Sequence, residues 1–383
     1  MEKYSRSAAV INLANVANNI AVVRKMINEN TRLMAVVKAN GYGHGIYEVS
    51  KAATDVAGAD YLGVATVMEG VFLRRMGITA PILVLSPTFE EEFEKVISNN
   101  LTCTLFSLDV AKKLADTAKN MERPVKIHIK IDTGMNRVGY NAQDWESVEA
   151  VAAEITEISR LEGIELEGIY SHLATSDADP VFAKEQFANF KHILGILENK
   201  GLHIPIKHIS NSGAILNHPE FNMDMVRAGV LTYGLAPNST REGVIQLAKL
   251  GFLPAMTLKS RIAHIKTVKA GQSVGYSRNF FAKKDMQVAT IPLGYGDGIS
   301  RHLSNRGKVL INGHFCDIIG NVCMDQFMVD ASGAKAKFRD EVIIIGQSGE
   351  ERIWAEDVAA WQRSINYEVA TSISDRVPRI YIK

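Results

Sequence analysis

Eight short β-rich segments, separated by longer amphipathic segments, restrict the fold of this 383-residue chain more than any other feature. We predict strands at Leu33–Lys38, Tyr61–Ala65, Ile82–Ser86, Leu101–Phe106, Val125–Asp132, Leu166–His172, Ile206–Asn211 and Met225–Gly229. Between them apolar residues recur every three or four positions, which predicts helices at Val67–Met76, Phe89–Ser98, Ser107–Asn120, Trp145–Ser159 and Val181–Asn199. Eight such units predict an α/β fold with an N-terminal (β/α)8 barrel of the TIM type, whose active site lies at the carboxyl ends of the strands.

The pattern changes after about Pro237. Closely spaced β-rich runs, separated by glycine and asparagine, follow at Ala255–Val268, Val288–Pro292, Lys308–Ile311, Phe315–Ile319, Gln326–Val329 and Glu341–Ile345. Helical spacing nearly vanishes in this part of the chain. We therefore predict a barrel domain over residues 1–240 and a mostly β domain over residues 241–383.

The composition argues against several kinds of partner. A formal net charge of +1 leaves no positive excess to attract nucleic acid or an anionic membrane, so we expect neither, and a small-molecule substrate instead. Cys103, Cys316 and Cys323 are widely spaced, so we expect neither a disulfide framework nor a metal site. No run approaches the ~18 apolar residues of a membrane helix, and the first residues lack a signal-peptide core, so we expect a cytoplasmic protein.

Lys38 stands where the first predicted strand ends and a glycine-rich turn begins, in the segment Met34–Gly45. A lysine at the end of a buried strand is desolvated, which lowers its pKa and frees the amine to form a Schiff base with a carbonyl cofactor. The alternative is a surface lysine beside an ordinary loop between a strand and a helix.

The segment Ala35–Gly45 resembles the cofactor-lysine motif of the alanine racemase family, which uses pyridoxal 5′-phosphate (PLP). Further motifs follow in the order of that family: Ile131–Gly139, Ser210–Ser212, Met225–Gly229, Pro292–Gly298, Cys323–Asp325 and Ile365–Val369. The resemblance spans nearly the whole chain. It implies a homodimeric isomerase that interconverts L-alanine and D-alanine and supplies D-alanine for the peptidoglycan of the cell wall.

The phosphate of a barrel-bound cofactor is often held by the loops after the seventh and eighth strands. Ser212, Gly229 and Val230 lie in those loops, and Tyr42 follows Lys38 closely enough to add a phenolic hydrogen bond. The resemblance implies that these positions contact the phosphate, and we assign Asn211 to the cofactor site with them. Ser212 could also be a helix N-cap, and the two roles are compatible.

Racemisation requires a base on each face of Cα. The resemblance implies that Lys38 serves one face and that Tyr276 of the partner subunit serves the other. A tyrosine has an unperturbed pKa near 10 and must be tuned to act as a base. By resemblance, His172 bonds that tyrosine and is itself bonded by Arg227, which faces the pyridine nitrogen. Without the resemblance, Arg227 is equally a salt-bridge residue and His172 a buried core histidine.

The resemblance also assigns the substrate carboxylate. Arg137 matches an arginine near the cofactor ring and that carboxylate, for which a planar fork of donors is suited. Lys130 matches a lysine that is carbamylated in many members of the family and that braces this arginine. Met324 and Asp325 match a segment that binds the substrate in the site of the other subunit, which implies a head-to-tail homodimer. The alternative for Met324 is a place in the β core.

Three positions depart from the family pattern. Gly41 and Gly296 stand where the family usually has alanine, and both changes are mild. Asp375 replaces a tyrosine that reaches the phosphate in several relatives, and an ionised carboxylate cannot donate that bond. The substrate preference therefore stays open between alanine and serine.

Other readings of the same motifs remain. A serine or broad-specificity racemase shares every motif. A decarboxylase on the same barrel conflicts with Arg227, because those enzymes place an acidic residue against the pyridine nitrogen. A PLP carrier with a single barrel accounts for Lys38 but not for the β domain.

Overall fold

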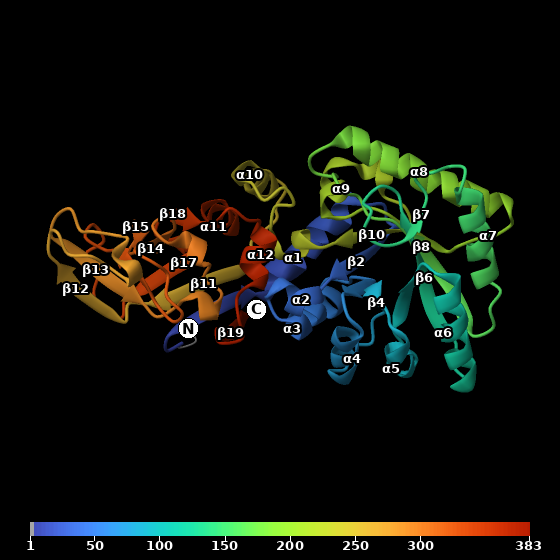
Figure 1. Cartoon of the computed structure of the whole chain (residues 1–383), viewed down its shortest axis with the longest axis horizontal. Helices are drawn as coiled ribbons and strands as arrows, with labels where there is room; N and C mark the ends of the chain where they lie inside the picture. Colours follow the sequence, from blue (N-terminus) through green and yellow to red (C-terminus); the bar gives the residue numbers. More distant parts are fainter. Residues whose placement is uncertain (1–3) are drawn as a thin grey trace. The chain divides into compact units, whose positions relative to one another are not determined.

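The computed structural model describes residues 4–383 and separates into two compact units. The barrel unit consists of Ala17–Gly41 and Val49–Thr232. The β unit consists of the described residues up to Val16, of Tyr42–Glu48 and of Tyr233–Lys383. Figure 1 shows the chain from end to end with most of its elements labelled.

The barrel unit contains eight parallel strands in the order β10-β2-β3-β4-β5-β6-β8-β9. Their bounds are β2 Arg32–Val36, β3 Tyr61–Val64, β4 Ile82–Pro87, β5 Thr102–Leu105, β6 Val125–Asp132, β8 Ile164–Tyr170, β9 Ile206–His208 and β10 Met225–Ala228, and the two-residue β7 Tyr140–Asn141 pairs with β6. The backbone N–H of Arg227 donates to the carbonyl of Ser210 over 3.0 Å, which joins the two ends of the sheet into a nearly closed barrel. The predicted α/β class, the barrel and its eight strands are confirmed.

Helices cover the outside of these strands, as Figure 1 shows for α4 to α8. The helices in this part of the chain are α1 Leu13–Met26, α3 Ile46–Lys51, α4 Val67–Arg75, α5 Phe93–Ser98, α6 Leu108–Asn120, α7 Val148–Ile158, α8 Pro180–Asn199 and α9 Ser212–Asn217. Helix α6 illustrates their logic, since Ala111, Leu114, Ala115 and Ala118 share one buried face at helical spacing. The five predicted helices are confirmed within a few residues.

The β unit is built on a mostly antiparallel sheet in the order β12-β13-β16-β15-β14-β17-β11-β1-β19, with β18 paired to β17. Its strands are β1 Ser7–Asn12, β11 Met256–Arg261, β12 His264–Val268, β13 Met286–Ile291, β14 Lys308–Ile311, β15 His314–Ile319, β16 Phe327–Asp330, β17 Glu341–Ser348, β18 Glu351–Ile353 and β19 Arg379–Ile382. The run predicted over Ala255–Val268 is two strands, because the backbone of Ile262 and Ala263 turns to bond Asp340 and Thr290. Three helices that the spacing did not predict also occur: α10 Arg241–Lys249, α11 Ala355–Gln362 and α12 Asn366–Thr371.

Neither compact unit is a single continuous segment of the described residues. The longest segment of the β unit begins at Tyr233, but β1, near the start of the chain, also belongs to this unit. β1 pairs with β11 on one side and with β19 on the other, as Figure 1 shows by its blue strand beside the last strand. A short apolar run does not reveal which sheet it joins, so the sequence did not indicate this pairing.

Candidate active site

Lys38 follows β2 at the carboxyl end of the barrel, where the backbone makes an unusual turn. In the element α2 Lys38–Tyr42 the residues Ala39, Asn40 and Gly41 have φ angles of 52°, 54° and 60°. Left-handed geometry costs roughly 1–2 kcal/mol for each residue other than glycine. Contacts with neighbouring residues must therefore stabilise this turn, and residues outside it supply them. Glu69 is one of them, since its carboxylate accepts hydrogen bonds from the backbone N–H of Ala39 over 2.7 Å and of Ala65 over 2.8 Å.

Glu69 was not predicted as a site residue. It lies in α4 three residues after the N-cap Thr66, with which it forms a capping box. This Thr-x-x-Glu spacing is visible in the sequence and could have indicated the residue. Its further bond to the Lys38 turn could not, because the two segments are 30 residues apart.

The Lys38 amine lies in a partly buried, positively charged setting. Burial lowers its pKa, the guanidinium of Arg137 lowers it further, and Glu69 opposes these effects. Arg227 lowers the pKa as well. A larger share of this amine is therefore neutral at a given pH than for an exposed lysine, and a neutral amine is the form that attacks a carbonyl.

Arg227 lies in β10 and is almost fully buried, with 3% of its surface exposed. Its Nη1 donates to Nδ1 of His208 over 2.7 Å, and its Nη2 donates to the carbonyls of Ser171 over 2.8 Å and Ile209 over 2.9 Å. Burial lowers its pKa to about 10, which still leaves the guanidinium charged at neutral pH. These bonds fix the orientation of a cation inside the barrel.

His172 lies just beyond β8 and receives a hydrogen bond from the same guanidinium. Nη2 of Arg227 is 3.2 Å from Nδ1 of His172. Burial, followed by the charge of Arg227, holds the pKa of His172 well below its usual value, so the imidazole is neutral. Because an arginine can only donate, Nδ1 accepts and the single ring proton is on Nε2.

Arg137 is positioned through its backbone by Asp132, at the end of β6. One carboxylate oxygen of Asp132 accepts from the N–H groups of Gly134 and Asn136, and the other accepts from the N–H of Arg137, all over 3.0 Å. Three backbone donors on one carboxylate hold this loop in a single conformation. Asp132 was not predicted, although an aspartate followed by Thr-Gly is a turn signal.

Lys130 lies in the same strand, beside the ring of Tyr170 and close enough to Arg227, Asp132 and Arg137 to feel their charges. Its side chain is buried, its Nζ donates to the carbonyl of Ile131 over 2.6 Å, and it lies 5.4 Å from the centre of the Tyr170 ring. Burial, with Arg227 next, lowers its pKa to about 7. This amine is therefore close to half neutral at neutral pH.

The loops after β9 and β10 are joined by Ser212. Its Oγ accepts from the backbone N–H of Gly229 over 2.9 Å and of Leu231 over 3.4 Å. Asn211, not Ser212, is the N-cap of α9, because its Oδ1 accepts from the N–H of Ala214 over 3.0 Å. Val230 begins the 3-10 turn that follows. The pair of loops thus presents hydroxyl and backbone groups side by side.

The structure assigns the remaining predicted residues to the β unit. Tyr276 and Met324 have exposed side chains, 72% and 53% of whose surface is accessible. Asp325 forms an ion pair with Arg376 over 2.6 Å. Tyr42 is buried beside Tyr233, with ring centres 5.0 Å apart, and burial raises its pKa to about 12.

The barrel unit therefore brings together Lys38, Lys130, Arg137, His172, Asn211, Ser212, Arg227, Gly229 and Val230. This set fits PLP by its chemistry. A lysine amine of lowered pKa can bind an aldehyde, a donor-only arginine can face a pyridine nitrogen, and hydroxyl and backbone groups can hold a phosphate. Among residues 4–383 no group of His, Cys, Asp and Glu side chains is arranged to hold a metal ion.

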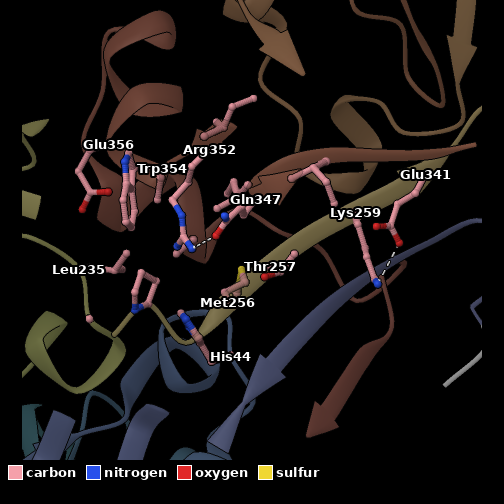
Figure 2. Close-up of a pocket in the computed structure, with 18 residues that line it drawn as sticks. His44, Leu235, Met256, Thr257, Lys259, Glu341, Gln347, Arg352, Trp354 and Glu356 are labelled. Carbon is pink, nitrogen blue, oxygen red and sulfur yellow. Dashed lines mark hydrogen bonds and ion pairs between the residues drawn. The ribbon is translucent and has the colours of Figure 1, made fainter. Parts of the chain in front are cut away.

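Figure 2 shows a pocket of about 270 Å³ that lies within the β unit. Its charged side chains are paired, since Lys259 contacts Glu341 over 3.1 Å and Arg352 lies 4.6 Å from the ring centre of Trp354. None of the predicted site residues lines it, in the part of the chain that the structure describes. Within that same part, no helix is both long and apolar enough to span a bilayer.

Comparisons with known proteins agree with this geometry. Residues 11–237 match a family model described as the N-terminal domain of alanine racemase, and residues 255–381 match its C-terminal domain. "Alanine racemase 2" of Caldanaerobacter subterraneus subsp. tengcongensis is 44% identical to this chain, over 97% of this chain and 94% of that protein.

Two solved structures extend the similarity to the fold. The alanine racemase of Clostridium difficile 630 superposes with a TM-score of 0.92 and is 39% identical, covering 100% of this chain and 97% of that one. An alanine racemase from Bartonella henselae with covalently bound pyridoxal phosphate gives a TM-score of 0.86 at 27% identity, covering 99% of this chain and 100% of that one.

Proposed function

The chain belongs to the alanine racemase family, and we propose that it interconverts L-alanine and D-alanine with PLP as its cofactor. One observation carries the proposal beyond the family. Lys38, a partly buried amine of lowered pKa, stands with Arg137 and Arg227 at the carboxyl ends of the barrel strands, where enzymes of this fold place their chemistry.

The cofactor would be held at both ends by groups of this chain. Lys38 would bind its aldehyde, and Arg227 would donate to its pyridine nitrogen. Ser212, Gly229 and Val230 hold its phosphate, with Asn211 fixing the turn and Tyr42 adding a phenolic hydroxyl. When bound, PLP supplies an electron sink that weakens the Cα–H bond of the amino acid. Because an arginine stays charged and can only donate, Arg227 would favour an unprotonated pyridine nitrogen, which would limit that sink and its side reactions.

Two bases exchange the proton on opposite faces of Cα. Lys38 acts from the barrel, and Tyr276 acts from the β unit of a partner subunit. His172 supports the second base, because its Nε2 carries the proton and can donate it in a hydrogen bond to a phenolate oxygen. The exposure of Tyr276 in the single chain supports a role that is completed by a second chain.

The proposed homodimer pairs the barrel of each chain with the β domain, residues 241–383, of the other. Met324 and Asp325 then contact the substrate from the partner side, while Arg137 binds the substrate carboxylate through its guanidinium. An arrangement in which each chain completes the other gives two equivalent sites related by a two-fold axis.

Carbamylation of Lys130 is a further part of the proposal. A neutral amine attacks carbon dioxide, and the Lys130 pKa of about 7 makes the neutral form abundant near neutral pH. The product carries a negative charge, which would relieve the repulsion among Lys130, Arg137 and Arg227.

We place the activity in the cytoplasm, where D-alanine serves peptidoglycan synthesis. Serine remains the alternative substrate because Asp375 stands where several relatives have tyrosine. The Asp375 side chain is fully exposed, and its carboxylate lies 3.9 Å from Arg379. A carboxylate therefore stands at the position where those relatives have an aromatic ring.

Borohydride reduction of the PLP-loaded protein tests the proposed cofactor site. Peptide mapping should find the reduced pyridoxyl group on Lys38, and Lys38→Ala should remain unlabelled. Labelling of another lysine in the wild type would remove the barrel site from the account.

A further inference from the structure

A chain of four side chains runs through the inside of the barrel from Arg227 to Glu167. Nη1 of Arg227 lies 2.7 Å from Nδ1 of His208, and Nε2 of His208 lies 2.9 Å from Nδ1 of His128. Nε2 of His128 then lies 3.3 Å from a carboxylate oxygen of Glu167. His128, Glu167 and His208 come from β6, β8 and β9, which are consecutive in the sheet, and Arg227 comes from β10, which meets the end of β9 where the barrel nearly closes.

The two imidazoles are held tightly in this chain. Both histidines have no exposed surface, and the His208 ring stacks on Tyr170 with centres 4.8 Å apart. Gly168 gives the His128 ring its space, since a Cβ at that position would lie 2.5 Å from Cε1 of the ring. Any larger residue there would displace the imidazole.

Arg227 and Glu167, at the two ends of this hydrogen-bonded series, determine which ring nitrogen of His128 and His208 carries the proton. Arg227 only donates, so Nδ1 of His208 accepts and the His208 proton is on Nε2. That proton is donated to Nδ1 of His128, which leaves the His128 proton on Nε2, facing Glu167. All the donors therefore point away from the arginine, towards the carboxylate.

The pKa values agree with this direction. Burial lowers the pKa of His128 and holds that of His208 well below its usual value, so both rings are neutral. Burial would raise the pKa of Glu167, but the bonds from His128 and Lys126 outweigh it and bring the pKa to about 2. Glu167 is thus an ionised group that only accepts.

We propose that Glu167 is a positioning residue of the site: as the acceptor at the far end of this chain, it orients His128 and His208 so that Arg227 is held as a donor. Glu167 itself lies away from the reacting atoms and acts only through the two imidazoles. The proton positions on His128 and His208 depend only on these four hydrogen-bonded side chains. The effect of Glu167 on racemisation rests on the proposed function.

Lys126 makes a sharp test possible. Its Nζ donates to the other oxygen of Glu167 over 2.7 Å. In Glu167→Gln the single amide oxygen is drawn to this lysine, which can only donate, so the amide N–H faces Nε2 of His128. The protons of His128 and His208 must then move to Nδ1, where that of His208 meets the N–H of Arg227.

The first experiment locates these protons directly by neutron diffraction from deuterated crystals of the PLP-loaded enzyme. In the wild type we expect deuterium on Nε2 and none on Nδ1 of both His128 and His208. In Glu167→Gln we expect deuterium on Nδ1 of His208, or loss of the contact between Arg227 and His208. Deuterium on Nδ1 of His208 in the wild type would overturn the proposal. Unchanged deuterium positions together with an unchanged contact between Arg227 and His208 in the variant would also overturn it.

The second experiment measures kcat and KM for L-alanine. We expect Glu167→Gln to lower kcat by about tenfold with little change in KM, because Arg137 rather than Arg227 binds the carboxylate. Lys126→Met should stay within about twofold of the wild type.

The double variant Lys126→Met/Glu167→Gln should recover most of the lost kcat, because its amide is free to turn its oxygen to His128. A merely structural role of Glu167 predicts no such rescue, and its absence would contradict the proposal. If the wild type itself does not racemise alanine, the proposed function fails while the neutron result still decides the proton positions.

Discussion

Nη2 of Arg227 donates to Nδ1 of His172 over 3.2 Å, and this contact leaves the one proton of that imidazole on Nε2. An arginine that cannot accept a hydrogen bond thereby turns a neutral histidine into a donor of known direction. A phenolate oxygen placed at Nε2 would be stabilised by this donor. The proposed second base would therefore depend on Arg227 through His172.

Tyr276→Phe should abolish racemisation in both directions while PLP stays bound to Lys38. The phenolic oxygen is the only group that the substitution removes, and loss of a general base typically costs about a hundredfold or more in rate. Steady-state assays with L-alanine and with D-alanine measure this. Near-normal turnover would exclude Tyr276 from the reaction.

Mixed dimers test where that tyrosine acts. Lys38→Ala and Tyr276→Phe subunits are each expected to be inactive alone. In a heterodimer, one of the two sites receives an intact Lys38 from one chain and an intact Tyr276 from the other, so activity should return after subunit exchange. No recovery, despite exchange shown by native mass spectrometry, would mean that each site is built within one chain.

Asp132→Asn should weaken substrate binding through Arg137. An asparagine must turn its NH₂ towards either Arg137 N–H or the N–H groups of Gly134 and Asn136, which sets donor against donor. We expect KM for L-alanine to rise by about tenfold, or ~1.4 kcal/mol. Asp144→Asn is the matched control, because Asp144 caps an exposed turn. Equal kinetics in the two variants would show that Asp132 does not position the arginine.

Carbamylation of Lys130 should rise with pH. The neutral amine forms above the Lys130 pKa of about 7 and is lost as the pH falls below it. With ¹³C-labelled bicarbonate, NMR should detect a carbamate carbon that grows between about pH 6 and pH 8 in the wild type. Lys130→Gln should lack it. A signal that is independent of pH, or that persists in Lys130→Gln, would contradict the assignment.

The same pKa predicts a direction for stability. The pKa of Lys130 is lowered in the folded state, so between pH 7 and the ordinary lysine pKa of about 10.4 the unfolded chain binds more protons. The contribution of this residue to stability therefore increases as the pH rises through that window.

Asp375 should permit detectable racemisation of L-serine, with L-alanine remaining the better substrate. The carboxylate can accept a bond from the serine hydroxyl, but such a group usually changes discrimination by only ~1–3 kcal/mol. The measurement is kcat/KM for L-serine over L-alanine, with L-lysine as a third substrate. Asp375→Tyr should lower this ratio, and Asp375→Asn should preserve it. An unchanged ratio in Asp375→Tyr would remove Asp375 as its cause, and a wild-type ratio above one would make serine the preferred substrate.

The sequence predicted the eight barrel strands because each is a short β-rich run, bounded by segments with helical spacing. It did not predict the pairing of β1 with β11 and β19, since a strand pattern carries no information on a partner more than 200 residues away. The left-handed turn after Lys38 was also missed, because Ala39 and Asn40 adopt positive φ angles that only the surrounding contacts stabilise.

The sequence predicted the site residues that stand in recognisable motifs. It did not predict the residues that only the tertiary structure brings close together. Lys38 and Arg227 stand in recognisable segments. His128, Glu167 and His208 appear in the sequence as ordinary residues of three strands, and only the pairing of β6, β8 and β9 in one sheet brings their side chains within hydrogen-bonding distance.

Exchange of the Cα proton is the most direct measure of the central claim. The PLP-loaded protein is incubated in D₂O with L-alanine and, separately, with D-alanine, and both Cα deuterium and the two enantiomers are followed over time. We expect deuterium to enter Cα from either enantiomer and both incubations to converge on equal amounts of L-alanine and D-alanine. Failure of the opposite enantiomer to form while PLP remains on Lys38, or release of CO₂ in its place, would contradict the central claim.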